Sequence, residues 1–216
     1  SKGILNKDRL DVKDEFKEKW EMCQMTNKEG RSGGVMEAFK GVDVVCAASK
    51  PGPNTLDARW IKLMAKDPVL FCCANPIPEM WPWDAMENGA KVFATGRSDF
   101  PNQVNNSLGF PGIFRGTLDV MATTITDEMC IAAADELAKL AGENGLRADY
   151  IVPTMDDWEV FPREAAAVGM KAIEQGIARR NLTRKQIYDE AMEKIKAARD
   201  HTKLMMEKGV IPKAPI

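Results

Sequence analysis

Apolar residues in the first half of the chain gather in three short runs, at residues 42–48, 68–74 and 91–95. Each run is nearly continuous rather than alternating, which is typical of strands that are covered on both faces, as in a parallel sheet. A fourth and weaker run occupies residues 150–152. The pattern therefore predicts a sheet of parallel strands.

Helix-like segments separate these runs. Residues 56–65 carry apolar side chains at helical spacing and follow Asn54 and Thr55, which are candidate N-caps. A shorter helix is predicted over residues 83–87, before an Asn-Gly turn. Alternation of strands with helices favours an α/β fold built on a doubly wound parallel sheet.

The second half of the chain has helical periodicity. One predicted helix begins at Thr126 and ends at Gly142 or Gly145, and an alanine-rich helix covers residues 164–178. Thr183 opens a capping-box pattern that precedes a last long helix. Its charged face is interpreted as solvated, and it is a natural arm or interface element.

Three polar loops follow the predicted strands, at residues 49–53, 75–78 and 96–99. Ligands of doubly wound sheets bind outside the carboxyl ends of the strands, so these loops predict a common crevice. The alternative is that each loop is rich in Pro, Gly, Asn and Ser only because turns require these residues.

An amide-rich segment lies between the third strand and the next helix. It contains Asn102, Gln103, Asn105 and Asn106. Neutral amides both donate and accept hydrogen bonds, and they orient a polar ligand without changing its charge. The segment is therefore interpreted as a ligand-binding segment.

Composition narrows the classes of partner. The formal charge of −2, from 30 basic and 32 acidic residues, gives no footprint for nucleic acid or for an anionic membrane. No apolar run approaches the roughly 20 residues that span a bilayer, and the first residues lack the apolar core of a secretory signal. We expect a soluble, cytoplasmic protein.

Cysteine and histidine usage argues against a zinc cluster. The five cysteines form no Cys-x-x-Cys pair, and there is a single histidine, His201, which is interpreted as a surface residue. The adjacent Cys72 and Cys73 are interpreted as buried small hydrophobic residues rather than a redox pair.

Three segments together resemble the bacterial-type malic enzymes. They are residues 47–52 (Ala-Ala-Ser-Lys-Pro-Gly), residues 73–79 (Cys-Ala-Asn-Pro-Ile-Pro-Glu) and residues 95–115, which include Gly-Arg-Ser-Asp-Phe-Pro-Asn-Gln. The family transfers a hydride from malate to NAD or NADP and then loses carbon dioxide with the help of Mg²⁺ or Mn²⁺, which yields pyruvate. The resemblance also implies a homodimer.

The resemblance implies roles for five residues of this chain. Asn75 contacts the substrate or the nicotinamide, Asn106 holds the malate carboxylate, and Asn105 lies on the nicotinamide side. Ser49 and Lys50 belong to the loop that runs along the cofactor.

The resemblance also implies that part of the family's domain is missing here. No Gly-x-Gly-x-x-Gly motif occurs, and residues 1–5 resemble the end of the second strand of the cofactor domain. We expect a Rossmann-like, doubly wound parallel sheet that lacks its first βαβ portion. The expected organisation is a partial NAD(P)-binding domain over residues 1–180 and a helical carboxy-terminal arm over residues 181–216.

The catalytic acid, the catalytic base and the metal ligands of the family belong to the missing portion, so none is assigned in this chain. The isolated chain is therefore expected to be inactive. Lys2 could pair with a 2′-phosphate or be merely solvated, so the choice between NAD and NADP stays open. The alternative functions are a stand-alone binding module and, more weakly, another nicotinamide-dependent dehydrogenase.

Two pairs of charged residues keep two interpretations each. Arg97 and Asp99 are either a carboxylate clamp and an acid-base group or a salt-bridged part of the loop scaffold. Asp156 and Asp157 resemble metal ligands, but without a third carboxylate nearby they are interpreted as exposed or capping acids.

Overall fold

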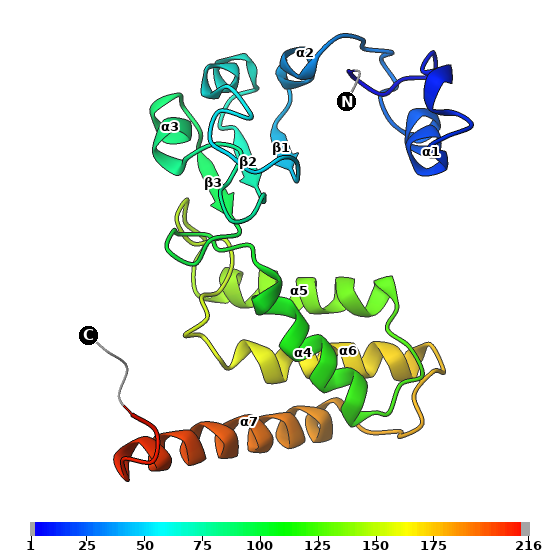
Figure 1. Ribbon diagram of the computed structural model, residues 1–216. Helices are drawn as coiled ribbons and strands as arrows, with labels where there is room; N and C mark the ends of the chain where they lie inside the picture. The colour runs from blue at the N-terminus through cyan, green and yellow to red at the C-terminus, as the bar shows by residue number, and fades with distance from the viewer. Residues whose placement is uncertain (1–2, 213–216) are drawn as a thin grey trace. The chain divides into compact units, whose positions relative to one another are not determined.

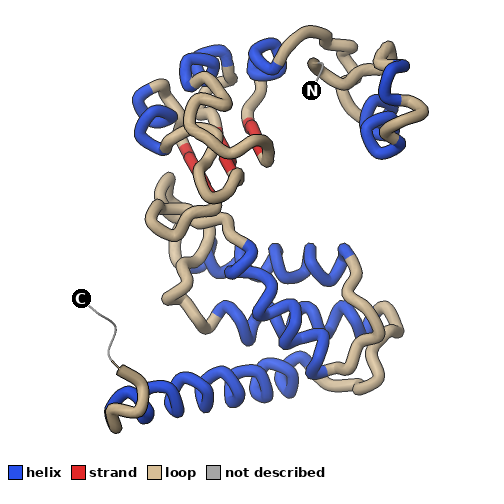
Figure 2. The backbone as a smooth tube through the Cα atoms, viewed as in Figure 1, coloured by secondary structure: helices blue, strands red, loops and turns tan. Residues whose placement is uncertain are grey.

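A computed structural model describes residues 3–212 and divides into two compact units, Ser1–Phe100 and Pro101–Ile216 (Figure 1). Each unit is described by itself. Strands occur in the first unit and long helices in the second (Figure 2). Among the described residues, no helix is both long and apolar enough to cross a bilayer. Lys2 lies outside the described residues.

The first unit contains a three-stranded parallel sheet. Its strands are β1 (Val44–Ala47), β2 (Val69–Cys72) and β3 (Val92–Thr95), in the spatial order β1-β2-β3. The pairing of β2 with both neighbours is parallel. The three predicted strands and their parallel arrangement are therefore confirmed.

The two faces of the sheet differ in burial. Leu70 and Phe93 share one face and belong to the main core of this unit, which also includes Phe39, Ile61 and Met80. On the other face Val44 is 49% exposed and Val69 is only half-buried. Coverage on both faces, which the apolar runs predicted, therefore does not extend to β1 in the described part of the chain.

Short helices connect the strands. Residues 56–65, predicted to be an α-helix, instead form a 3₁₀-helix, η2 (Ala58–Leu63), capped by Asp57, whose Oδ1 accepts from Arg59 N at 2.9 Å. The predicted caps at Asn54 and Thr55 are therefore wrong. Helix α3 (Pro82–Glu87) confirms the short predicted helix and begins with Pro82, which needs no amide partner there.

Three further short elements precede the sheet in the chain. They are η1 (Leu10–Val12), α1 (Lys17–Met25) and α2 (Val35–Phe39). Val12, Cys23 and Phe39 are the buried residues of these elements.

The predicted strand at residues 150–152 is wrong. The backbone there forms bends rather than a strand, next to an isolated antiparallel bridge between Arg147 and Tyr150. The buried Asn102 takes the place of a neighbouring strand, because its side chain donates to Ala148 O at 2.8 Å and accepts from Ile151 N at 2.9 Å. A single amide thus satisfies backbone groups that a sheet would otherwise pair.

Four helices build the second unit: α4 (Asn106–Asp119), α5 (Asp127–Glu143), α6 (Val160–Glu174) and α7 (Arg184–Glu207). Thr126 caps α5, and Thr183 with Gln186 forms the predicted capping box of α7. Helix α6 begins and ends four residues earlier than its alanine pattern predicted. The division at residue 180 stays a prediction.

Glycines let α4 and α6 approach closely. A Cβ atom at Gly116 would lie 2.4 Å from Ala165 O, and one at Gly112 would lie 2.4 Å from the Cβ of Glu164. Neither space accommodates an alanine without movement of backbone or of a buried side chain. The glycines of α4 therefore fix the spacing between these two helices.

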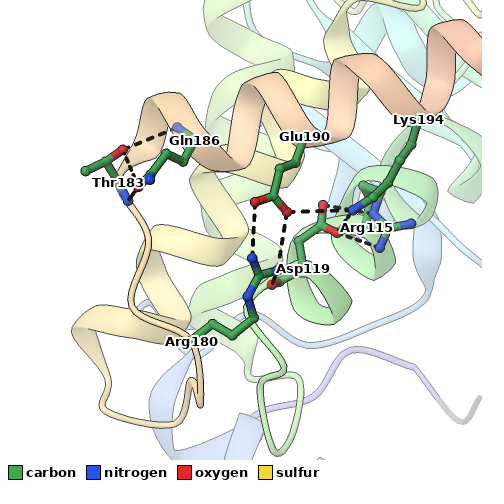
Figure 3. Close-up of polar contacts among 7 residues, drawn as sticks. All are labelled: Arg115, Asp119, Arg180, Thr183, Gln186, Glu190 and Lys194. Carbon is green, nitrogen blue, oxygen red and sulfur yellow. Dashed lines mark hydrogen bonds and ion pairs between the residues drawn. The ribbon is translucent and has the colours of Figure 1, made fainter.

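Asp119 at the end of α4 joins that helix to α7 (Figure 3). Its side chain is 1% exposed. The carboxylate accepts hydrogen bonds from the Arg115 guanidinium at 2.9 and 2.6 Å and forms an ion pair with Lys194 of α7. Arg180 donates to Asp119 O at 2.7 Å and pairs with Glu190 at 3.1 Å. Helix α7 is therefore anchored to α4 by charge, and its buried Ile187 belongs to the same apolar cluster as Val120, the C-cap of α4.

Glu136 is a second buried acid that joins helices, here α5, α6 and α7. Lys139, Arg163 and Arg184 approach its carboxylate at 3.1, 3.4 and 2.9 Å. Burial acts to raise the pKa of Glu136, but the hydrogen bonds and charges of Lys139 and Arg184 together outweigh burial and lower the pKa.

Glu164, in contrast, is fully buried on α6 without any hydrogen-bond partner for either carboxyl oxygen. Burial raises its pKa to about 9, and the charge of Glu136 adds to this effect. The unfolded chain ionises this group near its ordinary value of 4.5. The folded state therefore holds one proton more than the unfolded state between these two pH values, and stability falls as the pH rises through that window.

We predict that Glu164→Gln removes this pH dependence, because glutamine stays neutral. Its advantage over the unchanged chain should be absent below pH 4.5 and grow by about 1.4 kcal/mol per pH unit toward pH 9. Denaturant titrations at several pH values measure this difference. Glu193→Gln, on the exposed side of α7, is the control. If the free energy of unfolding of both variants depends on pH in the same way, a neutral Glu164 is contradicted.

Candidate functional site

The three polar loops all leave the same edge of the sheet, because β1, β2 and β3 are parallel and adjacent. Ser49 and Lys50 follow β1 and are exposed, and Asn75 follows β2 and is also exposed. Gly96 and Arg97 follow β3. The structure thus brings together the loops of the first unit that the sequence assigned to a crevice.

Glu79 links the first two loops and was not identified from the sequence. Its side chain is fully buried, and its Oε1 accepts from the Ser49 amide at 2.6 Å and from the Ser49 hydroxyl at 3.1 Å. Its Oε2 accepts from Ala74 N at 3.1 Å. The only sequence signal was a glutamate among prolines and apolar residues, where a solvated acid is not expected.

Arg97 links the second and third loops. Its guanidinium donates to Pro76 O at 3.0 Å and makes a two-pronged pair with Asp99 at 2.8 and 2.6 Å. The hydrogen bond from Arg97 lowers the pKa of Asp99. The salt-bridged interpretation of this pair is therefore the one that the geometry supports.

Aromatic rings surround this arginine. Its guanidinium carbon lies 5.8 Å from the Trp81 ring and 5.7 Å from the Phe100 ring. Trp83 stacks on Trp81 with ring centroids 4.9 Å apart. The Arg97 guanidinium therefore contacts aromatic rings as well as Asp99.

Asn75 packs against Gly96 across the two loops. A Cβ atom at Gly96 would lie 3.2 Å from Asn75 Nδ2 and 3.4 Å from Oδ1. The Asn75–Pro76 peptide bond is cis. In the described part of the chain the exposed Asn75 amide makes no hydrogen bond, so it can bind a ligand from solvent.

The amides of the second unit have different tasks. Asn105 is the N-cap of α4, and its Oδ1 accepts from Ser107 N at 3.0 Å. Asn106 is the first residue of α4 and is exposed. Asn102 is buried and holds residues 148–151, so its interpretation as a ligand-binding amide is replaced by a structural task. Cofactor and substrate roles for Asn105 and Asn106 stay predictions.

The remaining candidate groups do not form a reactive cluster. Burial raises the pKa of the Cys72 thiol to about 12, which fits a small apolar residue. Asp157 Oδ2 accepts from Thr154 N at 2.8 Å and from the Tyr150 hydroxyl at 3.3 Å, so it closes a turn before α6, whose N-cap is Glu159. His201 is exposed. Within residues 3–212, no three His, Cys, Asp or Glu side chains gather as a metal site.

Comparison with known proteins gives a consistent result. The family model described as "Malic enzyme, NAD binding domain" matches residues 1–174. The bifunctional malic/malolactic enzyme of Bacillus subtilis is 46% identical over 179 residues, which are 83% of this chain and 43% of that protein.

Two solved structures are also similar. The malic enzyme of Entamoeba histolytica is 48% identical with a TM-score of 0.95, over 100% of this chain and 45% of that one. The malic enzyme of Pyrococcus horikoshii is 40% identical with a TM-score of 0.87, over 95% of this chain and 47% of that one. The chain thus spans less than half the length of these relatives.

We predict that Gly96→Ala displaces the Asn75 amide while the fold is retained, because the backbone of Gly96 needs no positive φ and Asn75 can move into solvent. The NMR signals of the Asn75 side-chain amide should shift, and stability should change by less than about 1 kcal/mol. The control is Gly34→Ala, whose Cβ meets nothing within 4 Å. Unchanged Asn75 signals would show that this packing does not hold the amide.

Proposed function

This chain belongs to the malic enzyme family, and on that premise we propose that it is part of an enzyme that converts malate to pyruvate and carbon dioxide with NAD or NADP. In this proposal it forms the carboxy-terminal portion of the NAD(P)-binding domain. The observation that carries the proposal is the exposed Asn75 amide, packed on Gly96 where β2 and β3 end. Such an edge is where α/β sheets bind their ligands.

The finer fold that we propose is a Rossmann-like doubly wound sheet that is completed by strands outside this chain. Support comes from β1, which pairs only with β2 among the described residues and leaves Val44 49% exposed. An apolar edge strand of this kind is suited to pairing with a further strand. The half-exposed second face of the sheet is suited to covering helices.

The proposed binding roles follow the loops. Ser49, Lys50 and Asn75 lie along the cofactor, and Asn75 also reaches the substrate. A bound nicotinamide would accept the hydride, and a bound Mg²⁺ or Mn²⁺ would polarise the carbonyl before decarboxylation. The amides orient these groups and transfer no proton.

Asn106 is proposed to hold the malate carboxylate, with Asn105 on the nicotinamide side. Two features support Asn106: it is exposed, and it is the first residue of a 14-residue helix. The dipole at a helix N-terminus favours a bound anion.

The described residues do not fit the metal, because no three ligating side chains gather among them. Nor does Tyr150 stand in a reactive setting, since its hydroxyl accepts from Asn144 at 3.0 Å and donates to Asp157. We therefore propose that the catalytic acid, the base and the metal ligands are supplied by residues outside this chain. The chain by itself would then be inactive.

The homodimer is proposed on the family resemblance, and the location and the excluded partners are proposed on the composition and charge of the chain. The complete enzyme would be a cytoplasmic homodimer that binds malate and releases pyruvate, with no nucleic acid or membrane partner.

We predict that the chain alone does not reduce NAD or NADP with malate and Mn²⁺. Addition of the portion of the Bacillus subtilis relative that this chain does not match should restore malate-dependent absorbance of reduced nicotinamide. The control is the added portion alone. Binding of dinucleotide without turnover in the mixture would favour a stand-alone binding module, and turnover by the chain alone would contradict the proposed division of the site.

We predict that Asn106→Ala lowers turnover in the reconstituted enzyme by about ten- to a hundredfold, because a hydrogen bond to a charged carboxylate is lost. Stability should change by less than about 0.5 kcal/mol, since Asn105 rather than Asn106 caps the helix. The matched control is Asn181→Ala, another exposed asparagine. Equal specific activity of the two variants would remove Asn106 from the site.

A further inference from the structure

Glu79 combines complete burial with hydrogen bonds to both neighbouring loops. Three donors reach its carboxyl group, two from Ser49 on one oxygen and one from Ala74 on the other. All three are donors that point at the carboxyl oxygens, so both oxygens act as acceptors. Ala74 directly precedes Asn75, and Ser49 directly precedes Lys50. The carboxylate therefore lies behind the residues to which the proposed function assigns ligand contacts.

The two loops are also joined by their backbones. Gly52 N donates to Ile77 O at 3.3 Å, and Leu56 N donates to Glu79 O at 3.2 Å. These bonds lie farther from the strands and do not depend on the side chain of Glu79. The carboxylate adds a link only at the first loop residues, where β1 and β2 have just ended.

A buried carboxylate adds little stability by itself. The free energy lost when it leaves water is about as large as the free energy that its hydrogen-bond partners provide. Its directional bonds do fix geometry, however, because two oxygens at a constant separation hold Ser49 and Ala74 in register. The side chain is fully buried, so it presents no surface of its own to a ligand.

We propose that Glu79 is a positioning residue: its carboxylate sets the Ser49–Lys50 loop and Asn75 at the spacing that binds the dinucleotide. This proposal rests on the proposed function. The consequence is specific. Loss of the carboxylate should weaken cofactor binding more than it slows the chemical step in a saturated enzyme.

Glu79→Gln tests this with little change in volume. Glutamine keeps one acceptor oxygen and replaces the other with an NH₂ donor, so one of the two loops meets a donor where it needs an acceptor. That loop should move away from the amide. In the reconstituted enzyme we expect the KM for NAD or NADP to rise by about tenfold or more, while kcat stays within about twofold.

If Glu79 had only a structural role, its substitution would lower kcat and leave KM unchanged. Partial unfolding lowers the fraction of active enzyme, so apparent kcat falls and KM does not change. That result, or unchanged values of both parameters, would overturn the proposal. Glu164→Gln, assayed at pH 7, is the control, because it makes the same substitution at a fully buried glutamate that has no partners and lies on α6. It should leave KM unchanged.

Two additions keep the test decisive. If Glu79→Gln does not fold, Glu79→Asp retains the charge but shortens the side chain, and it should also raise KM.

Amide hydrogen exchange of the chain alone reports on the link between the two loops without catalysis: the amide of Ser49 or of Ala74 should lose protection in Glu79→Gln. Retained protection at both amides would reject the positioning role, whereas lost protection without turnover by the unchanged reconstituted enzyme would reject only the proposed function.

Discussion

A carboxylate that leaves water must find hydrogen-bond donors or keep its proton, and much of this structure follows from how its buried acids meet that constraint. Four acids are buried among the described residues: Glu79, Asp119, Glu136 and Glu164. Three of them gather donors from segments that are distant in the sequence. The fourth, Glu164, has none and retains its proton.

The three satisfied acids join elements by directional bonds, in addition to their apolar contacts. Glu79 joins two loops at the edge of the sheet, and Asp119 joins α4 to α7. Glu136 joins α5 to α6 and α7. Apolar packing is not directional, whereas a charge-assisted hydrogen bond has a set length and direction. The core of each unit is therefore apolar, while the register between its elements is set by charge.

Local signals in the sequence predicted local structure well. The three strands were recognised from continuous apolar runs, and the capping box at Thr183 was recognised because both of its partners lie within one turn. The family was recognised from loop segments and is confirmed by the match over residues 1–174. The strand at residues 150–152 failed because its run was short and its backbone groups are satisfied by Asn102, a residue 46 positions before Ala148.

Non-local partners explain what the sequence missed. Glu79 and Ser49 are 30 positions apart, and Asp119 and Lys194 are 75 apart, so neither pair forms a sequence pattern. The three polar loops were predicted from their position after the strands, but the side chains that hold them were not. Within the amide cluster, Asn102, Asn105 and Asn106 differ in task only because the backbone presents one to the interior, one to the helix cap and one to solvent.

Contacts within the three polar loops also determine which of their chemical groups are engaged and which stay exposed. Arg97 is engaged by Asp99 and Pro76 O, and the raised pKa of Cys72 keeps that thiol protonated. The exposed group that remains at the end of β2 is the amide of Asn75, which neither gains nor loses a proton at ordinary pH. Because bound orientation alone can supply a large part of a rate enhancement, the Asn75 amide is suited to orienting a ligand rather than to exchanging protons with it.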